Sequence, residues 1–142
     1  MTANTAPIFS KLGEIDGSNT GIGTSIVSDY DGTGANNVLV FTADATNGGF
    51  LQRLRFKARG TNAVSVARVY INNGSTPGTA ANNYFYGEFS LPATTASTTA
   101  ATPDVDYPMN LALPPGFRVY VGISAASALA SGWAVTGVGG VY

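Results

Sequence analysis

The sequence contains no histidine and no cysteine, and only 11% of its 142 residues are charged. Without cysteine there are no disulfides or thiolate metal sites, and without histidine the most common general base is missing. A nucleophile would have to be a serine or threonine activated by Lys11, or Glu14 and Asp16 would have to act as a carboxylate pair. No further signature accompanies these residues, so the sequence predicts neither enzyme activity nor a cofactor.

The net charge is also small, and the sequence has no long apolar run. The formal net charge of −1 gives no bulk attraction to nucleic acid or to an anionic membrane. No apolar run approaches the ~20 residues of a membrane-spanning helix. The opening MTANTAPIFSKLGEI has no basic region before an apolar core, as a secretory signal would. We therefore expect a protein made soluble in the cytoplasm, with no nucleic-acid or membrane partner.

The chain does contain many short runs in which apolar and polar residues alternate, separated by Gly, Asn, Pro, Thr and Ser. This pattern is typical of short strands in an all-β domain. Beyond a polar stretch at 1–15, the strand candidates are residues 21–27, 37–43, 50–60, 63–71, 84–91, 105–113, 117–124 and 132–138. Long connections at 28–37, 72–83 and 92–104 favour crossovers between two sheets over a meander.

We therefore expect an all-β protein, an antiparallel eight-stranded jelly-roll-like β-sandwich with a polar N-terminal arm. Residues 1–15 form the arm or a leading strand, and residues 16–142 form a single domain. The run at 37–43 is too continuous for a one-sided strand and is expected to be buried on both faces or to cross a sheet corner. Thr61-Asn62 is expected to close a hairpin, and SAASALAS (124–131) to form at most one helical turn.

A cluster of basic residues is the first candidate for a site. Successive side chains on a strand face opposite sides, so the basic residues of 50–60 share one face while Leu54, Phe56 and Ala58 share the other. This face suits an electrostatic contact with an acidic protein surface, or it is a solvated face that discourages aggregation. Nucleic acid is disfavoured because no aromatics interleave with the cations. The candidate protein-contact surface comprises Arg53, Arg55, Lys57 and Arg59, with Arg68 on the partner strand.

Two acidic pairs, Asp29/Asp31 and Asp104/Asp106, resemble the opening of a calcium-binding loop. Neither pair is followed by the further ligands and the bidentate glutamate that would make the pattern specific. Aspartate and glycine are also the usual residues of turns. The sequence therefore predicts no metal site.

Aromatic residues are the remaining candidates. They would form either a sugar-stacking platform or parts of the core and of interfaces, and their alternation along the strands favours the core. The residues concerned are Tyr84, Phe85, Tyr86, Tyr107, Tyr120 and Trp133.

Four segments resemble small virion proteins of tailed bacteriophages: FTADATNGGFLQRLRFKARGTN, VARVYINNGS, YGEFSLPATTAS and YPMNLALPPGFRVYVGIS. They are most similar to the jelly-roll decoration, or cement, proteins of phage heads, and the resemblance covers the chain from about Gly13 onward. It implies a non-enzymatic structural protein of the virion that binds the outside of the major capsid protein lattice, or another virion protein, and stabilises the particle.

The low charge also favours self-association, as a dimer or trimer, with residues 1 to about 12 crossing to a neighbouring chain or to the capsid. An alternative function is a tail or fibre accessory module that binds host glycans through exposed aromatics. A secreted carbohydrate-binding or hydrolytic domain is a further alternative, but it would need an export signal and paired carboxylates in a cleft.

Overall fold

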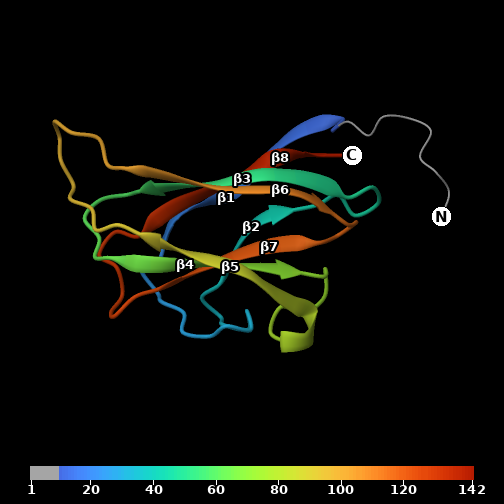
Figure 1. Cartoon of the computed structure of the whole chain (residues 1–142), viewed down its shortest axis with the longest axis horizontal. Coiled ribbons are helices and arrows are strands. Elements are labelled where there is room, and N and C mark those ends of the chain that lie inside the picture. The colour runs from blue at the N-terminus through green and yellow to red at the C-terminus, as the bar shows by residue number, and fades with distance from the viewer. Residues whose placement is uncertain (1–9) are drawn as a thin grey trace.

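The structure, a computed structural model, describes residues 10–142 and contains two four-stranded antiparallel sheets packed face to face (Figure 1). Sheet A has the order β1 (Leu12–Ile22), β8 (Trp133–Val141), β3 (Gly49–Ala58) and β6 (Asp104–Leu113). Sheet B has the order β2 (Val38–Thr42), β7 (Arg118–Ser124), β4 (Ser65–Asn72) and β5 (Asn83–Leu91). One 3-10 turn, η1 (Ala80–Asn82), precedes β5. Within residues 10–142, no helix has the length and apolar character needed to span a membrane.

The strand order identifies the topology. Every connection except β4–β5 carries the chain from one sheet to the other, and all neighbouring strands are antiparallel. This is the arrangement of a jelly roll. The predicted fold class is therefore confirmed. Because β1 begins at Leu12, residues 12–15 of the 1–15 segment expected to form an arm or leading strand belong to sheet A, whereas residues 1–9 lie outside the described part of the chain.

The core lies between the sheets and follows the period-2 pattern of the strands. On β3, Leu54, Phe56 and Ala58 face inward with at most 3% exposure, as their spacing predicts. Trp133, at the start of β8, is fully buried, so its expected place in the core is confirmed. Burial of such large apolar side chains is the main stabilising contribution to a sandwich of this kind.

The continuous apolar run at 37–43 is explained by a bulge. Pairing of β2 with β7 shifts between Leu39 and Phe41, so that Val40 and Phe41 are both fully buried while Leu39 remains 37% exposed. A bulge places two successive residues against one partner and interrupts strict alternation. The run is therefore neither buried on both faces nor at a sheet corner, as the sequence had suggested, but belongs to a bulged edge strand.

One predicted strand is absent. Residues 23–27, predicted as part of a strand at 21–27, instead leave the sheet after β1 ends at Ile22. Gly23 has a positive φ of 99°, and a Cβ there would lie 2.8 Å from Leu129 Cδ1 and 3.1 Å from Ile123 Cγ2. Only glycine adopts this conformation readily while leaving room for both neighbours. The glycine therefore redirects the chain where alternation alone predicted a strand.

Two predicted connections are also wrong, and SAASALAS, expected to form at most one helical turn, forms none. Residues 72–83 do not cross between the sheets; they form the β4–β5 hairpin within sheet B. Thr61-Asn62 does not close a hairpin, because β3 and β4 belong to different sheets. The SAASALAS segment contains no helical turn, and it is held by Leu129, which is 3% exposed and donates its backbone N–H to Gly23 O at 2.9 Å.

Asn62 links three connections at one end of the sandwich. Its side-chain oxygen accepts the backbone N–H groups of Gly132 (2.7 Å) and Ser131 (3.1 Å), and its Nδ2 donates to Gly132 O (3.0 Å). Its backbone exchanges two hydrogen bonds with Thr94, at 3.1 and 2.9 Å. The residue is only 3% exposed. Asn62 therefore joins the β3–β4, β5–β6 and β7–β8 connections through buried hydrogen bonds.

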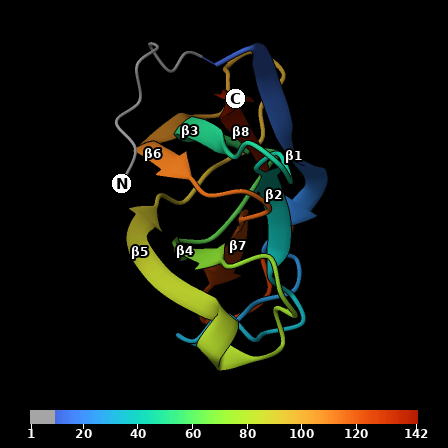
Figure 2. The same ribbon diagram turned by 90° about the vertical axis from the view of Figure 1, so that its right-hand side faces the viewer.

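The outer faces of the two sheets differ. Residues 23–37, which connect β1 to β2, run across the outside of sheet B (Figure 2) and are attached by Val27 N, which donates to Ile123 O at 2.9 Å. The outer face of sheet A keeps its polar side chains in solvent, with 44% exposure for Arg55 and 45% for Lys57. Sheet A therefore presents the more open face of the sandwich.

Candidate functional site

The predicted basic face lies on the outside of sheet A. It adjoins acidic residues of the neighbouring strand β6, which the sequence analysis did not assign to this face. In the register of β3 with β6, Lys57 lies opposite Asp104 and Arg55 opposite Asp106. We call these four residues, together with Arg53, the charged ladder. Cross-strand pairs of opposite charge stabilise a sheet modestly and reduce the net charge of its face.

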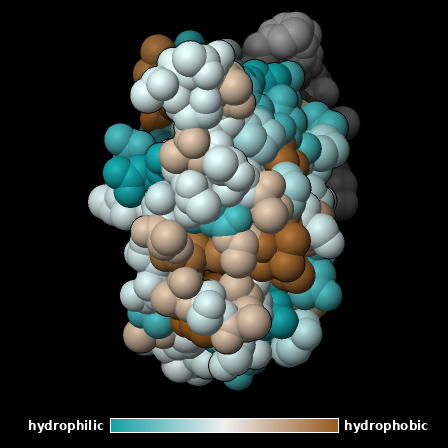
Figure 3. Space-filling model, turned by 90° about the vertical axis from the view of Figure 1, so that its left-hand side faces the viewer, coloured by the Kyte–Doolittle hydropathy of each residue, from teal (hydrophilic) through white to brown (hydrophobic). Residues whose placement is uncertain are grey.

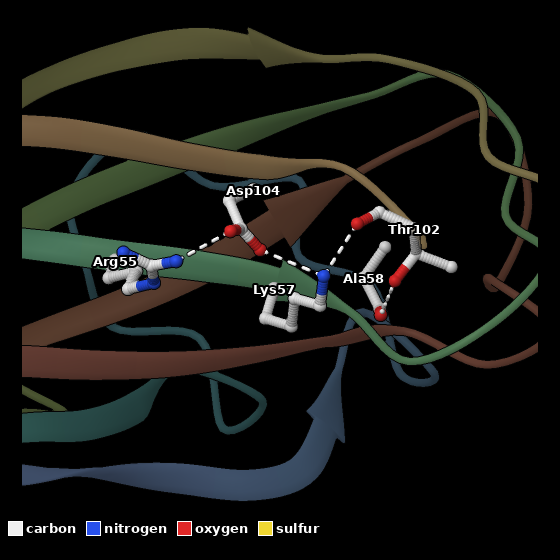
Figure 4. Close-up of polar contacts among 5 residues, drawn as sticks. All are labelled: Arg55, Lys57, Ala58, Thr102 and Asp104. Carbon is white, nitrogen blue, oxygen red and sulfur yellow. Dashed lines mark hydrogen bonds and ion pairs between the residues drawn. The ribbon is translucent and has the colours of Figure 1, made fainter. Parts of the chain in front are cut away.

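Figure 4 shows the contacts of three members of the ladder, Arg55, Lys57 and Asp104. Arg55 Nη2 lies 2.5 Å from Asp104 Oδ2, and Lys57 Nζ lies 3.0 Å from Asp104 Oδ1. Lys57 Nζ also donates to Thr102 O at 2.5 Å. The hydrogen bond from Lys57 and the charge of Arg55 lower the pKa of the Asp104 carboxyl, which keeps it ionised. One aspartate thus partly neutralises two of the four predicted cations.

The other two predicted cations are not paired. Within residues 10–142, neither Arg53 nor Arg59 forms an ion pair. Arg53 lies opposite Pro108 on one side and Val138 on the other, and its Nε is buried without a hydrogen-bond partner in the described part of the chain. Arg59 follows the end of β3 and donates its backbone N–H to Gly132 O at 3.1 Å. The uncompensated positive charge therefore lies at the two ends of the ladder.

The half of this face formed by β1 and β8 is uncharged. Ile15 lies opposite Val138, which in turn lies opposite Arg53, so the three form one outward row across the sheet. Ile15 is 75% exposed, more than any other large hydrophobic residue described. Gly17 and Thr136 form the next row. An exposed apolar strip beside arginines combines two features of protein–protein interfaces.

Arg68 does not belong to this face. It lies on β4 in the opposite sheet and is only 6% exposed, so the prediction that it extends the basic face from a partner strand is wrong. Its Nε lies 3.3 Å from Glu88 Oε2, and its Nη1 donates to Asp29 O at 2.9 Å. The burial comes from the connection at 23–37, which is distant from β4 in sequence. Strand periodicity alone therefore could not reveal it.

A cluster of aromatic side chains surrounds Arg68. Its guanidinium carbon lies 3.8 Å from the ring centroid of Tyr30, and the Tyr30 ring meets Phe85 edge-on at 5.5 Å. Tyr70 donates its hydroxyl to Asp29 O at 2.8 Å, and burial, followed by the Asp29 charge, raises the pKa of Tyr70 to about 12. We call Tyr30, Arg68, Tyr70 and Phe85 the aromatic cluster. Tyr30 was not among the predicted aromatics; its position between two aspartates suggested only a turn.

The other predicted aromatics are dispersed. Trp133 lies in the core, and Tyr107 stacks on Phe89 with ring centroids 4.6 Å apart, at the open edge between β5 and β6. Tyr120 is half-buried on β7. Tyr84 and Tyr86 are 55% and 40% exposed on β5. The structure therefore does not combine the six predicted rings into one platform.

A carboxylate from each of the two acidic pairs makes contacts with neighbouring residues. Asp31 Oδ1 accepts hydrogen bonds from the backbone N–H (3.0 Å) and hydroxyl (2.7 Å) of Thr33, which lower the pKa of the Asp31 carboxyl. Asp104 belongs to the charged ladder. Residues 10–142 contain no group of three or more His, Cys, Asp or Glu side chains placed to hold a metal ion. Glu14 and Asp16 lie two residues apart on β1, and both are half-buried.

An apolar groove lies at the end of the molecule formed by the β3–β4, β5–β6 and β7–β8 connections. It is lined by Val64, Val66, Leu91, Pro92 and Ala125, among others, and Val64 is 69% exposed. Figure 3 views this end of the molecule and shows apolar surface gathered at its middle.

A scan against protein-family models, a search of curated proteins and a search of solved structures each found no match for the chain. The resemblance to phage head-decoration proteins therefore has no support from known families or folds, and it stays a prediction.

Proposed function

We propose that the protein is a non-enzymatic structural component of a virus particle, which decorates and stabilises the outside of a phage capsid through protein–protein contacts. The observation that carries the proposal is the outer face of sheet A. There Ile15 is 75% exposed, in the same row of the sheet as Arg53, an arginine without an ion-pair partner in the described residues. Such a face suits a partner that covers apolar surface and supplies carboxylates.

The charged ladder refines the expected chemistry of the contact. Because Asp104 partly neutralises Arg55 and Lys57, those two residues attract an acidic partner less than their sequence positions suggest. Arg53 and Arg59 supply the remaining positive charge. The partner we propose is the major capsid protein or another virion protein, with self-association of the decorating protein as a dimer or trimer.

The proposal is tested by replacing Arg53, Arg55 and Arg59 with serine and measuring cosedimentation with particles at moderate salt. We expect weaker attachment and retained cooperative unfolding, because Arg55 and Arg59 are exposed, Arg53 is half-buried, and surface substitutions of this kind have small effects on stability. Arg118→Ser is the control for loss of a positive charge outside this face and is compared with Arg53→Ser alone; Arg118 lies on β7 in the opposite sheet, and its loss should leave attachment unchanged.

Equal attachment of the triple variant and the parent protein would show that this face is solvated and makes no contact. A direct test of the virion assignment is mass spectrometry of purified particles. Absence of the protein from both heads and tails would refute the assignment.

A further inference from the structure

We propose that the aromatic cluster is a binding site for a sugar ring, with Tyr30 as its stacking platform. The site lies outside sheet B, away from the face assigned to the particle contact, so this proposal does not depend on that function. Four of the large hydrophobic side chains described as exposed are aromatic. These four lie on β5 or on the connection at 23–37 that contacts it. They are Tyr30 (57%), Tyr84 (55%), Phe85 (42%) and Tyr86 (40%).

The position of the Tyr30 ring is fixed in the absence of a ligand. One ring face lies 3.8 Å from the Arg68 guanidinium, and the ring edge meets Phe85 at an interplanar angle of 87°. Arg68 is itself held by Glu88 and by Asp29 O, and it is 6% exposed. A ring held in this way loses little conformational freedom when a ligand stacks on it. Because Arg68 covers one face of the ring, the exposed surface includes the other.

Two carboxylates adjoin the aromatic cluster, Glu88 through its ion pair with Arg68 and Asp31 as the residue that follows Tyr30. Glu88 pairs with Arg68 through Oε2 and retains 43% side-chain exposure. Asp31 follows Tyr30 directly, and its backbone carbonyl accepts Asn83 Nδ2 at 3.2 Å, which ties it to the start of β5. The hydrogen bonds from Thr33 lower the pKa of the exposed Asp31 carboxyl further below neutral pH. Carboxylates form strong, charge-assisted hydrogen bonds with hydroxyl donors.

These features favour a pyranose over other ligands. The axial C–H groups of a sugar ring match an aromatic face in size and polarity, and its hydroxyls can donate to an exposed carboxylate such as that of the adjacent Asp31. A cationic ligand is disfavoured, because it would stack on a ring whose other face already carries the Arg68 charge. The ligand class is therefore a neutral hexopyranose or an oligosaccharide that exposes one.

The test is a titration of the full chain, with labelled aromatic side chains, followed by NMR. The probes are the methyl glycosides of glucose, galactose, mannose and N-acetylglucosamine. We expect saturable shifts of the Tyr30 ring with at least one probe and a dissociation constant of about 1–10 mM, which corresponds to a small interface. Tyr30→Ala should abolish the shifts of the remaining cluster, and Tyr30→Phe should retain binding because stacking needs the ring rather than the hydroxyl.

Two further variants complete the design. Tyr84→Ala is the matched control: it removes an equally exposed tyrosine of β5, and binding should be unchanged. Asp31→Asn should weaken binding about tenfold by replacing a charged acceptor with a neutral one.

The proposal is overturned if no probe gives saturable shifts up to about 50 mM, five times the upper expected constant. It is also overturned if Tyr30→Ala binds as well as the parent protein. If Tyr30→Ala instead weakens attachment to particles while no sugar shifts the spectrum, the cluster is a protein contact and the sugar proposal is wrong.

Discussion

Replacing Asn62 with alanine should destabilise the protein more than its position in a short connection suggests. The side chain makes hydrogen bonds to Gly132 N, Gly132 O and Ser131 N at 2.7–3.1 Å, in a region where Asn62 is 3% exposed. Each such bond contributes about 1 kcal/mol, and a buried N–H left without an acceptor costs about 1 kcal/mol more. The expected loss is about 3–4 kcal/mol, a large part of the ~5–15 kcal/mol typical of a domain.

The assay is urea denaturation followed by tryptophan fluorescence. Trp133 is the only tryptophan, is fully buried and adjoins Gly132, so its emission reports unfolding of the core next to the altered site. With a denaturant slope of about 2 kcal/mol/M, the midpoint should fall by roughly 1.5–2 M. The matched control is Asn36→Ala, which removes one exposed hydrogen bond, from Nδ2 to Ile26 O, and should cost at most about 0.5 kcal/mol.

A loss below about 1 kcal/mol for Asn62→Ala would refute this reasoning. It would mean that the three connections are held in place without the buried amide, or that water replaces it readily.

Three further outcomes are expected. The folded state should lose stability between pH 10 and about 12, because the raised pKa of Tyr70 makes the folded state retain a proton that the unfolded state releases. Tyr70→Phe should reduce this dependence and leave the contribution of Tyr107, whose pKa burial also raises, as measured by denaturation at each pH. Asp104→Asn should remove one contribution to acid sensitivity below about pH 4, because the folded-state pKa of Asp104 is lowered and its stabilising effect disappears as pH falls through that value. Deleting residues 1–10 should reduce particle binding or oligomer size in sedimentation while the sandwich still melts cooperatively. The arm hypothesis is wrong if the truncated domain unfolds. It is also wrong if the full chain is monomeric and the truncated protein binds particles normally.

The sequence predicted individual strands better than their assembly. On β3 the alternation of Leu54, Phe56 and Ala58 with charged residues identified the buried face, because the two-residue period is a local property of any strand. The partner of a strand is not a local property. The short segment at 59–64 suggested a hairpin, whereas Asn62 in fact holds a crossing between the sheets through partners about 70 residues away.

The candidate sites show the same limit. Asp104 and its two cations are separated by more than 40 residues, so the pairing on the charged ladder becomes visible only with the register of β3 and β6. Arg68 has the outward position that its spacing predicts, but the connection at 23–37 covers it. No spacing rule relates Tyr30 to Phe85 or Arg68, because their contact depends on where a long loop crosses sheet B.

The pairing of β1 with β8 has a consequence for the synthesis of the protein. Ile15 lies opposite Val138, so the first strand of sheet A waits for a partner made roughly 120 residues later. At about 5–20 residues per second, this delay amounts to about 6–25 s, during which Leu12 and Ile15 have no sheet neighbour. Sheet A therefore cannot be completed before β8 has been synthesised, and Figure 1 shows β1 and β8 side by side in the finished sandwich. Chaperones that bind short apolar strands have their longest opportunity at β1, and slower translation would lengthen it.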